Sequence, residues 1–321
     1  MRSISEQIRQ KAIDIGFHKV GFVKAEPLYD DGQKFREWLS RGYQGTMAWL
    51  EKYSETIIDP LKIIPDAKSI ISVAMNYYKN VSPLSNASTS SISQYAIGGD
   101  YHVVLKTRLN SLLDYIKEIE PSAKGKVFVD SGNIMEKVWA VRAGIGWRGK
   151  HSITVTKEYG SWVFLGEIIL NLELKYNLPQ IDLCGDCQIC IDACPTKALI
   201  KPYVLDANRC IAYLTIEHNG DIEKSLAEKI DHQIFGCDIC QEVCPWNKKN
   251  AKPTDVKELF PNNKYHSLRL ETFEKISQNE FNRIFDASPI KRSGLKRLKR
   301  NVRVVIDKIT KIERESNGKS L

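Results

Sequence analysis

Eight cysteines are the residues of this 321-residue chain whose types and spacing most clearly predict chemistry, and all of them lie within residues 184–244. The first run has the spacing C-x2-C-x2-C-x3-C followed by Pro195; its members are Cys184, Cys187, Cys190 and Cys194. The second run, GCDICQEVCPWN, has three more, and one lies upstream of it; these are Cys237, Cys240, Cys244 and Cys210. Because disulfides are rare in the reducing cytoplasm, where we expect this chain, the cluster of thiols predicts metal or cluster ligands.

The first run matches the spacing found in small bacterial proteins with two [4Fe–4S] clusters, where three cysteines bind one cluster and the fourth, beside a proline, binds the other. Such cross-ligation divides the eight cysteines into two sets with none left over. One set is Cys184, Cys187, Cys190 and Cys244, and the other is Cys194, Cys210, Cys237 and Cys240. Two structural zinc sites would use as many thiolates, but zinc does not require the x2-x2-x3-Pro order. The sequence therefore favours two iron–sulfur clusters.

Composition places the chain among ordinary globular proteins, with 42% hydrophobic and 27% charged residues. No segment approaches the ~18 consecutive apolar residues of a membrane-spanning helix. The opening residues MRSISEQIRQKAIDIGF lack the apolar run of a secretory signal and lack a twin-arginine motif. We therefore expect a cytoplasmic protein with no membrane partner.

Positive charge is concentrated near the end of the chain. The formal net charge is +8, and the stretch KRSGLKRLKRNVR (residues 291–303) contains no acidic residue. A polyanion is the natural partner for such a stretch, because each neutralised phosphate releases a bound counterion. The alternative is a helix face exposed to solvent. The candidate phosphate contacts are Lys291, Arg292, Lys296, Arg297, Lys299 and Arg300.

The elements around the cysteines predict an α/β (α+β) domain over residues 1–175, a ferredoxin-like iron–sulfur domain over 176–250, and a helical basic segment over 251–321. Apolar periodicity predicts helices near residues 4–15, 45–55, 101–119 and 133–144. Alternation and β-branched residues predict strands over 19–23, 69–78 and 126–130, and two more within 152–170 around Gly160. A serine-rich segment, 80–93, predicts a mobile surface loop. Since ferredoxins are small, the first domain should carry the chemistry that consumes the electrons.

Asp130 is the candidate catalytic residue of that domain. It ends the predicted strand KVFVD, and in α/β proteins ligands bind at the carboxyl ends of strands. From the residues alone, an equal alternative is that Asp130 caps the following helix. The next loop, RAGIGWRGKHSIT, has three glycines within six residues, which would allow close approach to a flat ligand or form a plain turn.

Several long segments resemble the epoxyqueuosine reductases, over about residues 4–301. They are VFVDSGNIMEKVWAVRAGIGWRGKHSITVTKEYGSWVFLGEIIL, GTMAWLEKY, DPLKIIPDAKSIISVAMNYY and ISQYAIGGDYHVVLKTRL. The resemblance implies cobalamin in the first domain, electrons passing to it from two [4Fe–4S] clusters, and reduction of epoxyqueuosine to queuosine at the wobble position of tRNA with a GUN anticodon. It also implies a reduced ferredoxin or flavodoxin as electron donor. DYHVVL lacks the glycine of the D-x-H-x-x-G motif, in agreement with that family's binding of the corrinoid without a histidine ligand.

The resemblance also implies roles for single residues. Asp130 would protonate the departing epoxide oxygen, with its pKa raised by burial against the corrin. The implied cofactor contacts are Ser93, Asp130, Gly146, Thr154 and Asp238, and residues 291–303 would bind the phosphates of the anticodon stem. Two positions depart from the family pattern, since Ile57 replaces a common arginine and Gln94 a basic residue.

Other interpretations remain open at this stage. Tyr95, Tyr101 and His102 would contact substrate or simply pack at the start of a helix. A corrinoid reductive dehalogenase would share the cofactors, but such enzymes are typically exported and use a tyrosine as the acid. A non-catalytic electron carrier or corrinoid-binding protein would need neither Asp130 nor the basic segment.

Overall fold

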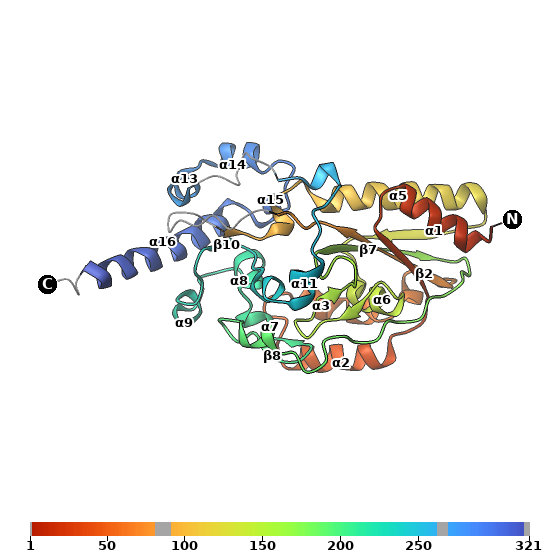
Figure 1. Ribbon diagram of the computed structural model, residues 1–321, viewed down its shortest axis with the longest axis horizontal. Helices are drawn as coiled ribbons and strands as arrows, with labels where there is room; N and C mark the ends of the chain where they lie inside the picture. The colour runs from red at the N-terminus through yellow and green to blue at the C-terminus, as the bar shows by residue number, and fades with distance from the viewer. Residues whose placement is uncertain (1, 81–90, 262–268, 318–321) are drawn as a thin grey trace.

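A four-stranded sheet forms the centre of the first part of the chain in the computed structural model, which describes residues 2–80, 91–261 and 269–317. Its strands are β1 (Lys19–Lys24), β2 (Ser69–Asn76), β7 (Val163–Leu170) and β4 (Gly125–Phe128), in that spatial order (Figure 1). Each neighbouring pair is antiparallel. The domain is therefore α+β, and the rule about the carboxyl ends of parallel strands, which we used to place Asp130, does not apply to it.

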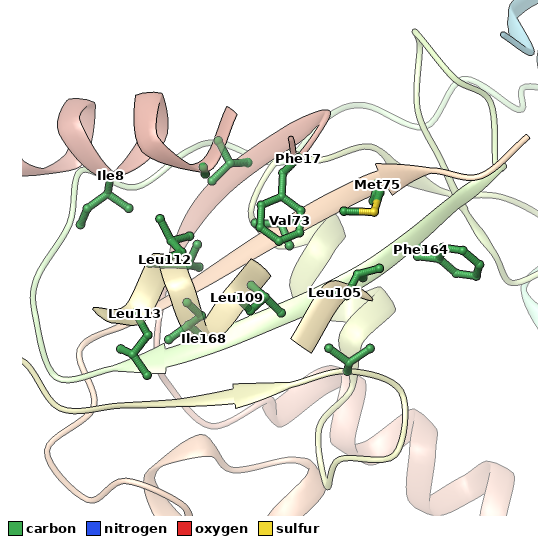
Figure 2. Close-up of a cluster of buried hydrophobic side chains, with 14 of the residues drawn as sticks. Ile8, Phe17, Val73, Met75, Leu105, Leu109, Leu112, Leu113, Phe164 and Ile168 are labelled. Atoms are coloured by element: carbon green, nitrogen blue, oxygen red, sulfur yellow. The ribbon is translucent and has the colours of Figure 1, made fainter. Parts of the chain in front are cut away.

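Helices cover both faces of this sheet, and the side chains of β2 alternate between the two faces. Ile71, Val73 and Met75 pack in the core beneath α1 (Ile4–Asp14) and α5 (Tyr101–Ile119). Figure 2 shows Leu105, Leu109 and Leu112 of α5, at the predicted helical spacing, in the same core as Val73 and Met75. On the other face, Ile70 packs with residues of α2 (Tyr29–Ser40) and α6 (Glu136–Arg142). All eight residues of β2 are buried, as expected for a strand covered on both faces.

Several predicted elements differ in extent from the observed ones. The helix predicted over 45–55 is two short helices, α3 (Trp49–Lys52) and α4 (Ser54–Ile57). The predicted helix over 133–144 begins only at Glu136, and the strand predicted to end at Asp130 ends at Phe128. Residues 152–170 contain two strands as predicted, but β6 (Thr154–Val155) pairs with β5 (Trp147–Arg148) rather than with β7. Most of the serine-rich loop predicted over 80–93 lies outside the described residues.

The cysteine region is built from short elements between loops. They are α7 (Ile189–Asp192), β8 (Leu199–Lys201), β9 (Val204–Leu205), α8 (Ile211–Ile216), α9 (Lys224–Ala227), β10 (Gln233–Phe235), α10 (Ile239–Glu242) and α11 (Pro245–Asn250). Single 3-10 turns cover Pro60–Lys62, Gln94–Ala96, Ala207–Arg209 and Lys257–Leu259. Among the described helices, none is both long enough and apolar enough to cross a membrane.

The C-terminal helices pack into a core shared with the two preceding regions. They are α13 (Leu270–Lys275), α14 (Gln278–Ile284), α15 (Ile290–Ser293) and α16 (Leu295–Asn317). The shared core joins Ile97 of the first region and Phe235 of β10 to Phe273 and Leu298 of these helices. In addition, β10 pairs in parallel with β3 (Ser91–Ile92). The helical character predicted for the end of the chain is confirmed, while the division into three domains stays a prediction.

Candidate active site

The eight cysteine thiols, all free, gather into two groups. Burial raises the pKa of Cys190 to about 11, with contributions from the neighbouring Cys244, Cys184 and Cys187 thiols. Burial likewise raises the pKa of Cys237, and here the contributing thiols are Cys210 and Cys194. Because such effects act between near neighbours, the two groups correspond to the sets given by cross-ligation. The Cys240 thiol is influenced by both Cys237 and Cys190, so the two groups lie beside one another.

Backbone N–H groups surround these thiols, as an anionic cluster would require. The Ala198 N–H donates to Cys194 Sγ at 3.3 Å, and the N–H groups of Trp246 and Asn247 point to the Cys244 sulfur. One four-thiolate zinc site would need all its sulfurs at ~2.3 Å from a single ion. A [4Fe–4S] cluster instead separates its four thiolates, one on each iron of the cube. The donor set fits two clusters, in which each iron takes its own thiolate.

Asp130 lies two residues beyond β4 with its backbone in the left-handed region, at φ 53°. Its Oδ2 is 3.0 Å from Nε2 of His102, whose Nδ1 is 2.7 Å from Oδ1 of Asp100. Burial alone would lower the pKa of His102, but its hydrogen bonds to the two carboxylates raise that pKa to about 9. The imidazole is therefore charged at neutral pH, and both ring nitrogens donate.

The contact with His102 also determines the direction in which the pKa of the Asp130 carboxyl is shifted. Burial would raise its pKa, but the hydrogen bond and positive charge of His102 outweigh burial and hold the pKa below its ordinary value. The side chain is 48% exposed. The pKa of Asp130 is thus lowered by its protein neighbours, and the raised pKa expected from burial against the corrin stays a prediction.

The alternative role of Asp130 as a helix cap is also wrong. Helix α6 begins at Glu136, its capping position is Met135, and no side chain caps it. Instead of Asp130 capping α6, a carboxyl oxygen of Glu136 in that helix accepts a hydrogen bond from the backbone N–H of Asp130.

A group of packed aromatic side chains lies next to Asp130. The Tyr101 ring stacks between His102 and Phe164, with centroid separations of 4.0 and 4.1 Å. Tyr95 meets Tyr101 edge to face at 6.0 Å. Burial raises the pKa of both tyrosines, which stay neutral. Tyr101 thus packs in the core at the start of α5 while its hydroxyl donates a hydrogen bond to the Asp130 carboxylate, which His102 also contacts directly.

Ser93 and Asp238, two predicted cofactor contacts far apart in the sequence, are hydrogen-bonded to each other. The Ser93 hydroxyl donates to one oxygen of Asp238, and the Gln94 N–H donates to the other at 2.7 Å. Pairing of β3 with β10 brings the two segments together. Gly236, at φ 74°, permits this approach, because an added Cβ would lie 2.5 Å from that of Ser93.

The departures at Gln94 and Ile57 have local explanations. The buried Lys79 lies against Gln94, and its ammonium group donates to the Gln94 carbonyl at 2.7 Å. A basic side chain is therefore present here, although burial lowers the pKa of Lys79 to about 7. Ile57 is 4% exposed, so an apolar residue suits its position.

Three side chains of the glycine loop each have a buried polar atom with no hydrogen-bond partner among the residues that the structure describes. The atoms are His151 Nε2, Ser152 Oγ and Thr154 Oγ1. His151 Nδ1 accepts the Ile153 N–H at 3.2 Å, so Nε2 carries the ring hydrogen. Buried polar atoms normally find partners, and such a group of orphans in one loop indicates a ligand with polar edges. The sequence does not single out His151, because the histidines of the chain show no spacing typical of metal ligands.

Gly146 has a different environment from the one expected. A Cβ there would lie 2.0 Å from the carbonyl oxygen of Val155, so glycine is needed for the packing of β5 against β6. This supports the plain structural interpretation of the glycine, and a direct cofactor contact at Gly146 stays a prediction.

The basic segment reaches this site through Arg292, which pairs with Glu217 and whose charge lowers the pKa of Asp130. Arg297 and Arg300 instead hold the segment 214–220 against α16. Arg297 donates to the Ile216 carbonyl, and Arg300 donates to the carbonyls of His218 and Gly220 at 2.9 and 2.6 Å.

The lysines of the basic segment also differ in whether they already have a partner within the protein. Lys291 pairs with Asp286. Lys296 and Lys299 have no hydrogen-bonding or ion-pairing partner within the part of the chain that the structure describes. The phosphate-binding prediction therefore depends chiefly on these two lysines.

Comparison with known proteins gives a consistent result. A family model described as "Epoxyqueuosine reductase QueG, DUF1730" matches residues 58–131, and one described as "4Fe-4S double cluster binding domain" matches residues 183–247. The epoxyqueuosine reductase of Atelocyanobacterium thalassa is 40% identical over 306 residues, which are 94% of this chain and 99% of that protein.

Solved structures of epoxyqueuosine reductases are also similar to this chain. A crystal structure of epoxyqueuosine reductase with an epoxyqueuosine-modified tRNA-Tyr stem loop is 31% identical, with a TM-score of 0.88, and the match covers 95% of this chain and 81% of that one. The Bacillus subtilis enzyme, in a structure with its catalytic aspartate loop swung out of the active site, is 31% identical with a TM-score of 0.86 and the same coverage.

Proposed function

The chain belongs to the epoxyqueuosine reductase family, and from this premise we propose that it reduces epoxyqueuosine to queuosine at the wobble position of tRNA. It is an oxidoreductase with two [4Fe–4S] clusters. The observation that carries the proposal is the position of Asp130. This carboxylate, paired with a charged imidazole, lies where the sheet domain, the cysteine region and the basic segment meet.

The residues around Asp130 fit cobalamin. His151, Ser152 and Thr154 offer buried polar atoms that lack partners and would bind the amide groups at the corrin edge. Ser93 and Asp238 lie beside Cys237 and would face the cofactor from the cluster side. When bound, cobalamin supplies the reductant that acts on the epoxide carbon, with electrons provided by the clusters and a reduced ferredoxin or flavodoxin.

The chain's own task is then to supply the proton. Opening an epoxide to an alkene consumes electrons and protons and releases the oxygen as water, so the leaving oxygen needs an acid beside it. The His102 imidazolium carries the proton, and its Nε2 donates to Oδ2 of Asp130. Asp130 would relay this proton to the oxygen and would recover it from His102.

This arrangement predicts a pH dependence. Because the pKa of His102 is raised to about 9, the imidazole is charged below that pH and loses its proton as the pH rises through it. We expect kcat to fall above about pH 9 in the wild type, and a His102→Gln variant to lose that descending limb at a lower kcat. Profiles of kcat against pH test this; an unchanged descending limb in the variant would assign it to another group.

The basic segment predicts two separable effects. Substituting Lys296 and Lys299 together by alanine should weaken tRNA binding and reduce the salt dependence, the slope of log K on log salt, by about 1 to 2. Arg300→Ala should instead lower the melting temperature, because it removes the donors that hold the carbonyls of segment 214–220 against α16. The matched control replaces Lys117 and Lys124, both exposed on the other side of the sheet domain. Equal loss of tRNA binding in the control would contradict a specific contact.

The proposed function is tested on the product. Anaerobically reconstituted protein is incubated with epoxyqueuosine-containing tRNA and a chemical reductant, and the nucleosides are analysed by mass spectrometry. We expect loss of one oxygen from the modified nucleoside. Full recovery of epoxyqueuosine, with both cofactors bound, would overturn the proposal.

A further inference from the structure

The backbone of Asp130 is held in an unusual conformation by one side chain. At φ 53° the residue occupies the left-handed region, which residues other than glycine, asparagine and aspartate rarely adopt. Its N–H donates to Oε1 of Glu136, in the first turn of α6. The same loop contains the short hydrogen bond from the Ser131 N–H to the Val129 carbonyl, at 2.6 Å. The direction of the Asp130 carboxyl toward His102 thus depends on a tightly turned loop.

Glu136 is itself well fixed. Its helix packs against the sheet through Trp139 and Ala140, both with 0% exposure. Below it lies Glu167 of β7, also fully buried, which accepts a hydrogen bond from the Ser72 hydroxyl at 3.2 Å. Burial and the charge of Asp130 raise the pKa of Glu136 to about 8. A largely neutral carboxyl can stay in this environment and still accept through its carbonyl oxygen.

We propose that Glu136 is a positioning residue for the reaction, which accepts the Asp130 N–H and thereby holds the Asp130 carboxyl against His102. The inference rests on the catalytic role proposed for Asp130. Without an acceptor at residue 136, the Asp130 N–H would lose its partner and the loop would relax from the left-handed conformation. The carboxyl would then leave the imidazole.

Two substitutions separate this role from proton donation by Glu136 itself. Glu136→Gln keeps an oxygen acceptor at the same place but cannot donate a carboxyl proton. Glu136→Leu keeps the volume and removes the acceptor. The matched control is Glu118→Leu on the exposed face of α5, which removes a glutamate from a helix far from the loop.

The direct readout is the hydrogen exchange of the Asp130 amide, which does not depend on activity. We expect exchange about ten- to a hundredfold faster in Glu136→Leu, the range for removing one partner of a hydrogen bond, and rates close to wild type in Glu136→Gln and in the control. In turnover assays, kcat should fall by a similar factor in Glu136→Leu, with KM unchanged, and recover in Glu136→Gln.

The outcomes distinguish the inference from its premise. Wild-type exchange at Asp130 in a folded Glu136→Leu protein would overturn the positioning role, whatever the activity. Loss of kcat in Glu136→Gln with a protected Asp130 amide would also overturn it, and would make Glu136 a proton donor. Should the wild type fail to reduce epoxyqueuosine, the exchange measurement alone still decides whether Glu136 fixes the loop.

Discussion

Replacing Asp130 by asparagine is expected to lower kcat about 10²- to 10⁴-fold, the usual contribution of a general acid. Asparagine keeps the size of the side chain but can neither accept the proton of His102 nor pass it to a leaving oxygen. The pKa of His102 should fall as well, because one of the two carboxylates that raise it is lost. Steady-state rates on epoxyqueuosine-containing tRNA, together with titration of the imidazole by NMR, measure both effects.

The matched control for this experiment is Asp114→Asn, which changes an exposed aspartate on α5. Iron content should be the same in the wild type and in both variants, since Asp130 is not one of the predicted cluster ligands. Activity of Asp130→Asn within about twofold of the wild type, well short of the loss of a general acid, would remove Asp130 from the chemistry.

Pairs of cysteine substitutions have the second large effect, and they test which thiols share a cluster. The wild type should contain about eight iron atoms per chain. Under cross-ligation, Cys184→Ala with Cys244→Ala damages one cluster and leaves about four iron atoms, whereas Cys184→Ala with Cys194→Ala damages both and leaves almost none. Either pair should abolish turnover, because the path for electrons is broken.

The competing arrangement gives the reverse pattern. If each run of the sequence held its own cluster, Cys184 and Cys194 would share one, and their joint loss would leave about four iron atoms. Iron analysis and electron paramagnetic resonance of the anaerobically reduced variants therefore decide between the two. The thiol groups around Cys190 and Cys237 lead us to expect the cross-ligated result.

Local patterns in the sequence predicted the parts of this protein that depend on near neighbours. The spacing of the cysteines within each run predicted two clusters, because most ligands of one cluster come from one short turn, and the assignment of each thiol stays a prediction. The leucines of α5 predicted that helix and its end before Pro121, because helical periodicity is a local property.

Other features arise from contacts between distant segments, which no local pattern reports. The hydrogen bond between Ser93 and Asp238 depends on the pairing of β3 with β10. The lowered pKa of Asp130 depends on His102. His102 lies in α5, which is separated from Asp130 in the sequence by a loop and β4. Arg300 donates hydrogen bonds to carbonyls of segment 214–220, which lies far from it in the sequence. Because the sequence shows only the charge of Arg300, it suggested a phosphate contact instead.

The most direct test of the account is a reconstitution in four parallel samples: apoprotein, protein with clusters, protein with cobalamin, and protein with both. Each is given a reductant and epoxyqueuosine-containing tRNA without oxygen, and the nucleoside is analysed by mass spectrometry. We predict queuosine only in the sample with both cofactors. Equal amounts of queuosine in the sample with clusters alone would contradict the account, because the site around Asp130 would then work without cobalamin.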